Sequence, residues 1–492
     1  SEVKIGVDEL SPVTQLFTEP YMVSFLLDNS LGAWWASQRL TDDDWQSAQS
    51  EQELREKAAI PGVPLSYLRF VKSEVTRQWQ PPSGTFDAWP KHLGEFKALD
   101  PCCGSGHFLV ATFLMLVPMR MQAEQLTARQ AIDKVLSENL HGLELDQRCV
   151  ELAAFAIALE AWRYPDSNNY RLLPRLNLAC CGQKISVKFK SDSYRRHGSQ
   201  ELKEALNRIE DQFIIAPYLG SLIDVKSALG VASKAVTSWR DVIEEIYCSL
   251  PSKVTDEYVE SVISAQGLIK SAKILDEEYN LVITNVPFRQ TDDLEKVLLD
   301  HIKCNYPLAK SDLATVFHQR LMRLLCSSGV LAVVQPQGFL YKDYYRQYRK
   351  VVFKGHAVPL IARLGSRAFS EISGEEVKVI LAIFKRARPT LESEICQIAA
   401  DEKECELQAS ELQNSYCSVS KQRNALISNS SILPFSYEKK HGELLEVYAN
   451  FSNGIQTGDY PRFGRKFWEI GSLDKSWKLQ LTTVDETSPW SG

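Results

Sequence analysis

The chain has 492 residues, of which 44% are hydrophobic and 24% charged, and its formal net charge is −6 at pH 7. At roughly 100–200 residues per domain, this length predicts two to four domains, and the composition is typical of a globular protein. No apolar run reaches the ~18 residues that a membrane helix needs, and no signal pattern begins the chain, so we expect a cytoplasmic protein without membrane contact. The 11 cysteines form no C-x-x-C pair, which predicts that no metal is bound.

The first 95 residues are rich in Trp and acidic residues, and we expect them to be mainly helical. From residue 96 onward, apolar runs alternate with helical patterns. The expected strands are 96–100, 140–145, 176–181, 279–284, 330–335, 356–364 and 377–384, with helices at 107–121, 151–162 and 313–325 between them. This alternation predicts an α/β domain over residues 96–390, with a mostly parallel sheet and helices on both faces.

Three further stretches depart from that pattern. Residues 186–275 are charged and helix-like, and we expect them to form a helical insertion at one edge of the sheet. Residues 391–450 turn polar, which indicates a linker or the edge of the next domain. Residues 451–492 regain Gly, Trp and basic residues but stop abruptly, so we expect a fragment of a longer chain.

A glycine-rich loop, Asp-Pro-Cys-Cys-Gly-Ser-Gly-His-Phe at 100–108, follows the first expected strand and begins a helix. Gly104 and Gly106 allow the backbone to approach a ligand closely, and the helix N-terminus offers unpaired N–H groups. A dinucleotide fingerprint would need glycine in place of Leu109, and a Walker loop would need Gly-Lys-Ser/Thr. Asp100, at the strand end, can bind the ammonium of an amino-acid moiety. A plain structural turn is the alternative.

The second strand ends in His-Gly-Leu-Glu-Leu-Asp at 141–146. Glu144 can accept hydrogen bonds from both hydroxyls of an adenosine ribose, and Asp146 is expected near the adenine. Two solvated charges in a loop are the alternative. Because ligands of open parallel sheets bind at the C-terminal strand ends, the loop at 285–288, which follows a later expected strand, can share one crevice with the loop at 100–108.

The expected strand at 279–284 runs into Asn285-Val286-Pro287-Phe288. An amino group on an aromatic base is a poor nucleophile because its lone pair is delocalised into the ring. The side-chain oxygen of Asn285 and the carbonyl oxygen of Val286 can accept hydrogen bonds from its two N–H groups. These hydrogen bonds make the nitrogen lone pair available for attack. Pro287 holds Val286 extended, and Phe288 can stack on a base that has left the duplex. A strand-terminating turn with a buried aromatic is the alternative.

Together these motifs resemble those of the amino-methyltransferases, in the adenine-N6 branch. Residues 100–108 are similar to the family's Asp-Pro-Ala-Cys-Gly-Ser-Gly cofactor loop, and residues 285–288 to its Asn-Pro-Pro-Tyr/Phe catalytic motif. Residues 17–20, Phe-Thr-Glu-Pro, resemble the N-terminal motif that closes over the methionine end of the cofactor. Residues 453–463 resemble the entry to the target-recognition domain of large bacterial type IIG, BREX and DISARM methyltransferases.

The resemblance implies a Rossmann-like S-adenosylmethionine-dependent methyltransferase fold. It implies an enzyme that methylates N6 of a flipped adenine in double-stranded DNA, as host modification in a phage-defence or restriction–modification system. Other defence-system subunits are further expected partners. The implied cofactor-binding residues are Phe17, Thr18, Asp100, Pro101, Cys102, Gly104, Gly106, Glu144, Leu145 and Asp146, and the implied catalytic residues are Asn285, Val286, Pro287 and Phe288.

Three departures from the family pattern bear on this reading. Val286 replaces the first proline, which keeps the carbonyl but not the fixed φ, and this variant favours the DISARM branch. Phe288 replaces tyrosine and keeps the stacking face. Residues 180–183, Cys-Cys-Gly-Gln, stand where some relatives carry an acid that binds the adenine amino group. The alternatives are methylation of cytosine N4 or of a protein glutamine, and a DNA-binding or scaffold subunit of a defence complex with weak or conditional activity.

Overall fold

The computed structural model describes the chain in several stretches. These are residues 18–73, 76–167, 169–182, 211–224, 226–227, 267, 270–291, 294–369, 378–402, 404–427, 431, 433 and 469. Most of the expected insertion at 186–275 lies outside the described residues, as do Phe17 and nearly all of residues 451–492, where the recognition domain was expected to start. The chain divides into two units, Ser1–Phe435 and Ser436–Gly492, and the described helices and strands belong to the first.

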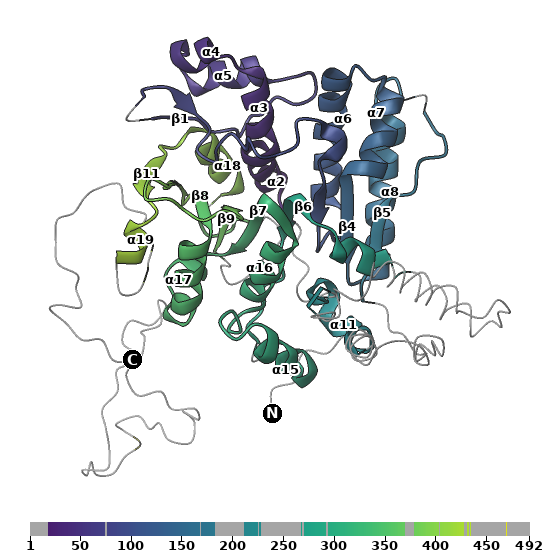
Figure 1. The fold of residues 1–492 in the computed structure, drawn as a ribbon, viewed down its shortest axis with the longest axis vertical. Helices are drawn as coiled ribbons and strands as arrows, with labels where there is room; N and C mark the ends of the chain where they lie inside the picture. Colours follow the sequence, from purple (N-terminus) through teal and green to yellow (C-terminus); the bar gives the residue numbers. More distant parts are fainter. Residues whose placement is uncertain are drawn as a thin grey trace. The chain divides into compact units, whose positions relative to one another are not determined.

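A nine-stranded sheet runs through this unit in the order β11-β10-β8-β9-β7-β6-β3-β4-β5 (Figure 1). Its strands are β3 (Ala98–Asp100), β4 (Leu140–Glu144), β5 (Asn177–Cys180), β6 (Tyr279–Asn285), β7 (Leu325–Pro336), β8 (Ala357–Leu364), β9 (Val379–Lys385), β10 (Glu394–Ala400) and β11 (Ser418–Lys421). Among them β9 and β11 run antiparallel to their neighbours, and the other adjacent pairs are parallel. The prediction of a mostly parallel sheet is confirmed, and all seven expected strands are present as β3 to β9.

Helices cover both faces of the sheet. Successive residues of a strand point to opposite faces, so they are buried against different layers of helices. In β3, for example, Ala98 packs into one hydrophobic cluster and Leu99 into the other. The first cluster includes residues of α2 (Pro20–Leu27), α3 (Ala33–Arg39), α6 (His107–Glu124) and α8 (Gln147–Arg163). The second includes residues of α15 (Lys296–Asn305), α16 (Leu313–Leu324) and α17 (Arg346–Gly355). The helices expected at 107–121, 151–162 and 313–325 correspond to α6, α8 and α16.

The N-terminal region is helical only in its first part. Helix α2 continues through a π-helical turn, Asp28–Gly32, into α3, and α4 (Asp42–Ser47) and α5 (Glu51–Ala58) follow. The described residues of 59–97 then form a short hairpin, β1 (Val71–Lys72) with β2 (Trp79–Gln80), a 3-10 turn at Leu93–Glu95, and irregular structure elsewhere. The expectation of a mainly helical region through residue 95 is therefore wrong beyond residue 58, where Pro and Gly are frequent.

Residues 391–450 were expected to form a linker or the edge of another domain, and for their first part this is wrong. Strand β10 pairs in parallel with β8, and β11 pairs with β10. Helix α18 (Cys405–Asn414) packs on β10, and α19 (Asn424–Ile427) follows β11. The polar sequence misled because β11 is an edge strand that is only partly buried, and its residues need not be apolar.

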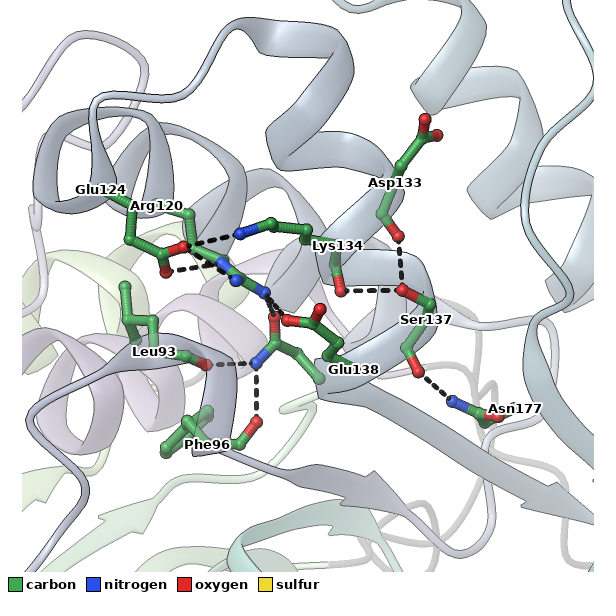
Figure 2. Close-up of polar contacts among 10 residues, drawn as sticks. Leu93, Phe96, Arg120, Glu124, Asp133, Lys134, Ser137, Glu138 and Asn177 are labelled. Carbon is green, nitrogen blue, oxygen red and sulfur yellow. Dashed lines mark hydrogen bonds and ion pairs between the residues drawn. The ribbon is translucent and has the colours of Figure 1, made fainter.

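A buried arginine closes the C-terminal end of α6. Arg120, 1% exposed, donates hydrogen bonds to the carboxylates of Glu124 and Glu138 and to the side-chain oxygen of Asn139 (Figure 2). Asn139 in turn donates to the carbonyls of Leu93 and Phe96. Because each buried polar group here has a partner, this network holds α6 firmly to the segments on either side of it.

The described part of the expected insertion includes α11 (Ala216–Leu219) and the 3-10 turn Gly220–Leu222. Through the carbonyls of Ser221 and Ile223, this segment accepts hydrogen bonds from the buried Arg320 of α16. It is therefore fixed to the helical layer that covers one face of the sheet. No described helix is long and apolar enough to cross a membrane.

Candidate active site

A cavity of about 970 Å³, measured out to open solvent, lies where β3, β4 and β6 end. Strand β3 is flanked by β4 on one side and β6 on the other. Strands β4 and β5 are therefore added on one side of β3, and the next strand along the chain, β6, is added on the opposite side. Such a switch point is where open parallel sheets bind their ligands. The cavity is lined by Thr18, Asp100, Pro101, Cys102, Cys103, Gly104, Ser105, His107, Phe108, Glu144, Leu145, Cys181, Tyr218, Leu219, Gly220, Ser221, Leu222, Asn285, Pro287, Leu298, Leu313 and Phe317.

The loop between β3 and α6 forms the floor of this cavity. Gly104 and Gly106 have φ angles of 50° and 95°, in the left-handed region that favours glycine. Gly106 does not line the cavity; a Cβ at this position would lie 3.0 Å from the Cα of Ala153. The loop therefore needs its second glycine so that α6 can pack closely against α8.

Glu144 is tied to this loop through the backbone. One carboxylate oxygen accepts a hydrogen bond of 2.8 Å from the Gly104 N–H, and the other accepts from the N–H groups of Leu145 and Asp146 at 2.7 and 3.3 Å. Burial raises the pKa of Glu144, and these three donors oppose the rise. The carboxylate is thus held at a fixed position on the cavity wall, where it keeps lone pairs for hydroxyl donors of a ligand.

Asp100 is 1% exposed and lies at the end of β3. Burial raises its pKa to about 7, although the Cys102 N–H and the Thr284 hydroxyl donate to it and lower the value. Among the described residues no Lys or Arg forms an ion pair with Asp100 or Glu144. A cationic ligand group would supply the missing charge and return the pKa of Asp100 toward its ordinary value.

Asn285 meets the N-terminal motif across the cavity. Its side-chain Nδ2 donates a hydrogen bond of 3.1 Å to the Thr18 hydroxyl, 267 residues away in sequence. This contact assigns the orientation of the amide and leaves the side-chain oxygen as its acceptor. A cofactor-closing motif and a catalytic motif that were expected separately therefore meet at one site.

The cysteines at the cavity are poor nucleophiles. Burial raises the pKa of Cys102, Cys103 and Cys181 well above the ordinary thiol value. A protonated thiol does not attack, and a covalent intermediate through these residues is disfavoured. No group of three or more metal-ligating side chains occurs within the described part of the chain.

Nine predicted site residues line the cavity together. They are Thr18, Asp100, Pro101, Cys102, Gly104, Glu144, Leu145, Asn285 and Pro287. Two predicted residues lie nearby without lining it: Val286 is 2% exposed in the core, and Phe288 is partly buried against both hydrophobic clusters. The expectation that Asp146 reaches the site is not met, because its carboxylate caps α8 at the Arg148 N–H and pairs with the Arg148 guanidinium.

The segment Tyr218–Leu222 is the main part of the wall that sequence reasoning missed. It lies inside the stretch that was expected to form a helical insertion at one edge of the sheet, and no glycine pattern or strand end marks it as part of a site. Leu313 and Phe317 of α16 were also not predicted as site residues, although α16 itself was expected. Their helical spacing of four, on a helix that follows the Asn285 loop, is the signal that could have found them.

The chain is similar to known DNA-modifying proteins. Residues 138–369 match the family described as Eco57I restriction-modification methylase, and residues 78–171 match the MmeI DNA-methyltransferase domain. Over 98% of its length the chain is 25% identical to the adenine-specific methyltransferase PglX of Lacticaseibacillus casei, and over 77% it is 26% identical to the adenine-specific methyltransferase BrxX of Escherichia coli. It spans 40% of the first relative and 31% of the second.

The fold also aligns with a solved DrdV–DNA complex. The TM-score is 0.42 with 14% identity, over 82% of this chain and 30% of the other. The curated relatives carry the names PglX and BrxX, and none of these comparisons tests the preference for the DISARM branch, which stays a prediction.

Proposed function

We propose that the chain is the catalytic part of an adenine-specific DNA methyltransferase. It transfers a methyl group from S-adenosylmethionine to the N6 amino group of a flipped adenine in double-stranded DNA. The observation that carries the proposal is one cavity that joins Asp100 and Glu144 to Asn285, with Thr18 bonded to Asn285. The names of the two adenine-specific relatives support the same reaction and base. In this proposal the fold is a Rossmann-like methyltransferase fold, and the protein acts in the cytoplasm.

The cavity fits the cofactor in its chemistry. Asp100 is a buried carboxylate without a described counter-charge, which suits the ammonium of the methionine part. Glu144 is held by three N–H groups and can accept the ribose hydroxyls. When bound, S-adenosylmethionine supplies an electrophilic methyl group on its sulfonium.

The loop at 285–288 would act on the base. The side-chain oxygen of Asn285 and the carbonyl oxygen of Val286 accept hydrogen bonds from the two N–H groups of the amino group. These hydrogen bonds favour a pyramidal nitrogen with an available lone pair. Pro287, which lines the cavity, keeps Val286 extended. Phe288 offers a stacking face that offsets part of the unstacking energy of the flipped base. This is positioning and electrostatic stabilisation, with no covalent intermediate.

The biological setting follows from the relatives. We infer that the methyl mark is a host modification in a phage-defence or restriction–modification system, with duplex DNA and other defence subunits as partners. The Val286 variant favours the DISARM branch within this setting, whereas the names of the two relatives favour the PglX and BrxX kind. Both branches share the reaction proposed for the site.

Transfer of a labelled methyl group from S-adenosylmethionine to duplex DNA, followed by nucleoside analysis, tests the proposal. We expect label in N6-methyladenine, and a loss of about 10²–10³-fold in rate for Asn285→Ala, the size found when one preorganised polar group is removed. Asn177→Ala, at the sheet edge away from the cavity, is the matched control and should keep full activity. Label in cytosine would overturn the adenine assignment. Cofactor binding without any transfer would favour the scaffold alternative.

A further inference from the structure

The far wall of the cavity holds a polar group that the proposed reaction does not use. The segment Tyr218–Leu222 forms this wall, and Ser221 within it is 3% exposed. The segment is fixed from behind: Arg320 Nε donates to the Ser221 carbonyl, and its Nη2 donates to the Ile223 carbonyl at 2.7 Å. Asp224 is paired with Arg320 and with Arg323. A wall anchored at this many points is preorganised for a rigid ligand.

The position of Ser221 relates it to one part of the proposed cofactor. If the ammonium binds at Asp100 and the ribose at Glu144, the base would lie beyond Glu144, where Leu145 and Cys181 at the end of β5 line the cavity. There Cys181 lies beside Glu144, and the Cys181 N–H donates a hydrogen bond of 2.8 Å to the Glu144 carbonyl. Gly220 abuts the same place, since a Cβ on it would lie 3.1 Å from Leu145 and 3.7 Å from the Cys181 sulfur. Ser221 follows Gly220, and its hydroxyl lies 3.8 Å from that sulfur.

The hydrogen bonding of Ser221 decides what it can recognise. Its hydroxyl donates to the Pro101 carbonyl of the cofactor loop. A serine hydroxyl has one proton and two acceptor lone pairs. Because that proton is committed to Pro101, the oxygen faces a ligand as an acceptor only. Residues 177–182 at the end of β5 offer no carboxylate that could take this role.

We propose that Ser221 determines specificity for the adenine ring of the cofactor, by accepting a hydrogen bond from its exocyclic amino group. This inference rests on the proposed function. A 6-oxo purine presents an acceptor at the same position, so its oxygen would meet the Ser221 oxygen with no proton between them. The wall therefore selects a 6-amino purine over a 6-oxo purine. Ser221 acts on the cofactor and leaves the choice of target base to the loop at 285–288.

Equilibrium binding of S-adenosylhomocysteine and S-inosylhomocysteine, measured by calorimetry without DNA, tests this inference. In the unsubstituted chain we expect the adenosyl compound to bind about 10–100-fold more tightly, because an unpaired buried polar group costs about 1–3 kcal/mol and each 1.4 kcal/mol is a factor of ten. In Ser221→Ala we expect this ratio to fall to within about threefold of one. Ser83→Ala removes an equally buried serine from a segment outside the cavity and should keep the full ratio.

The ratio separates recognition from structure. If Ser221 merely held the wall in place through Pro101, the substitution would weaken both compounds by the same factor, and an unchanged ratio would overturn the inference while leaving the proposed function intact. A chain that binds neither compound would overturn the proposed function, and this inference with it.

Discussion

The buried charged groups at the two ends of helix α6 differ in whether the chain supplies their counter-charges. At its C-terminal end Arg120 is buried and meets two carboxylates and an amide oxygen from the same chain. Beside its N-terminal end Asp100 is buried and Glu144 is partly buried, but they meet only N–H and hydroxyl donors among the described residues. The helix thus joins a complete polar network to an incomplete one.

The pKa directions express this difference. Burial alone would lower the pKa of Arg120, but Glu124 and Glu138 raise it overall, so the arginine stays charged at every physiological pH. Burial raises the pKa of Asp100 and of Glu144, and no cation within the described stretches offsets this rise. A charge that the chain neutralises itself serves the fold, whereas a buried carboxylate left without a counter-charge is suited to a ligand that brings one.

The largest expected effect comes from replacing Asp100, the buried carboxylate without a described counter-charge. The folded pKa of Asp100 is about 7, above its ordinary unfolded value, so the folded chain keeps a proton between pH 4 and pH 7 that the unfolded chain has lost. Asp100 therefore lowers stability as the pH rises through this window, by on the order of 4 kcal/mol in total. Asp100→Asn, a neutral isostere, should flatten this decline in urea unfolding measured from pH 5 to pH 8.

A matched control separates the charge effect from ligand binding. Asp28 is also buried with a pKa raised by burial to about 7, and it accepts a hydrogen bond from the Tyr67 N–H outside the cavity. Asp28→Asn should flatten the pH dependence to a similar degree but leave the affinity for S-adenosylhomocysteine unchanged, whereas Asp100→Asn should weaken it at least tenfold. Equal affinities in the two variants would contradict the assignment of the ammonium site.

The next effect breaks the complete network. Arg120→Met keeps the apolar stem and removes the guanidinium, so Glu124, Glu138 and Asn139 lose their shared donor. We expect a loss of about 3 kcal/mol in the free energy of unfolding, toward the low end for a broken buried pair because the two glutamates are partly exposed. Chemical denaturation measures the loss. Affinity for the cofactor should stay constant at temperatures where the variant is folded, and a weakened affinity would show that the two ends of α6 are coupled.

The surface supplies the control for this loss. Arg148 pairs with Asp146 while its side chain remains 82% exposed. Arg148→Ala should leave the free energy of unfolding nearly unchanged in the same denaturation measurement, since exposed ion pairs gain little in water.

The sheet could be predicted almost strand by strand, and the site only in part, for a physical reason. Strands β3 to β9 are apolar runs buried on both faces, and that pattern is visible in sequence. Strand β11 is a half-exposed edge, so its residues are polar and its presence depends on pairing with β10. Asp100, Glu144 and Asn285 lie at or directly after the ends of predicted strands, and a parallel sheet brings these strand ends to one edge.

Ser221 and Asp146 show where such reasoning stops. Ser221 reaches the cavity because its segment is hydrogen-bonded to α16 through Arg320 and Arg323, 97 to 99 residues away in sequence, and to the Pro101 carbonyl. Asp146 stands one residue beyond a true wall residue, Leu145, yet the start of α8 turns its carboxylate into a helix cap. Tertiary anchoring and a local cap are both invisible to spacing arguments.

The smallest expected effects compare the two glycines at the N-terminal end of α6. Gly106→Ala would adopt a left-handed conformation and place its Cβ 3.0 Å from both Cα and Cβ of Ala153, so α6 and α8 must move apart. We expect a loss of about 2 kcal/mol in unfolding free energy from strain and overpacking together. Gly104→Ala meets no atom within 4 Å of its Cβ and carries only the conformational strain, about 1 kcal/mol.

The order of the two variants reverses for ligand binding, because Gly104 lines the cavity and Gly106 does not. A methyl group at position 104 occupies ligand space, so Gly104→Ala should weaken S-adenosylhomocysteine more than Gly106→Ala does. Calorimetric affinities and denaturation midpoints of the two variants measure both orders, and parallel losses would mean that the loop serves packing alone.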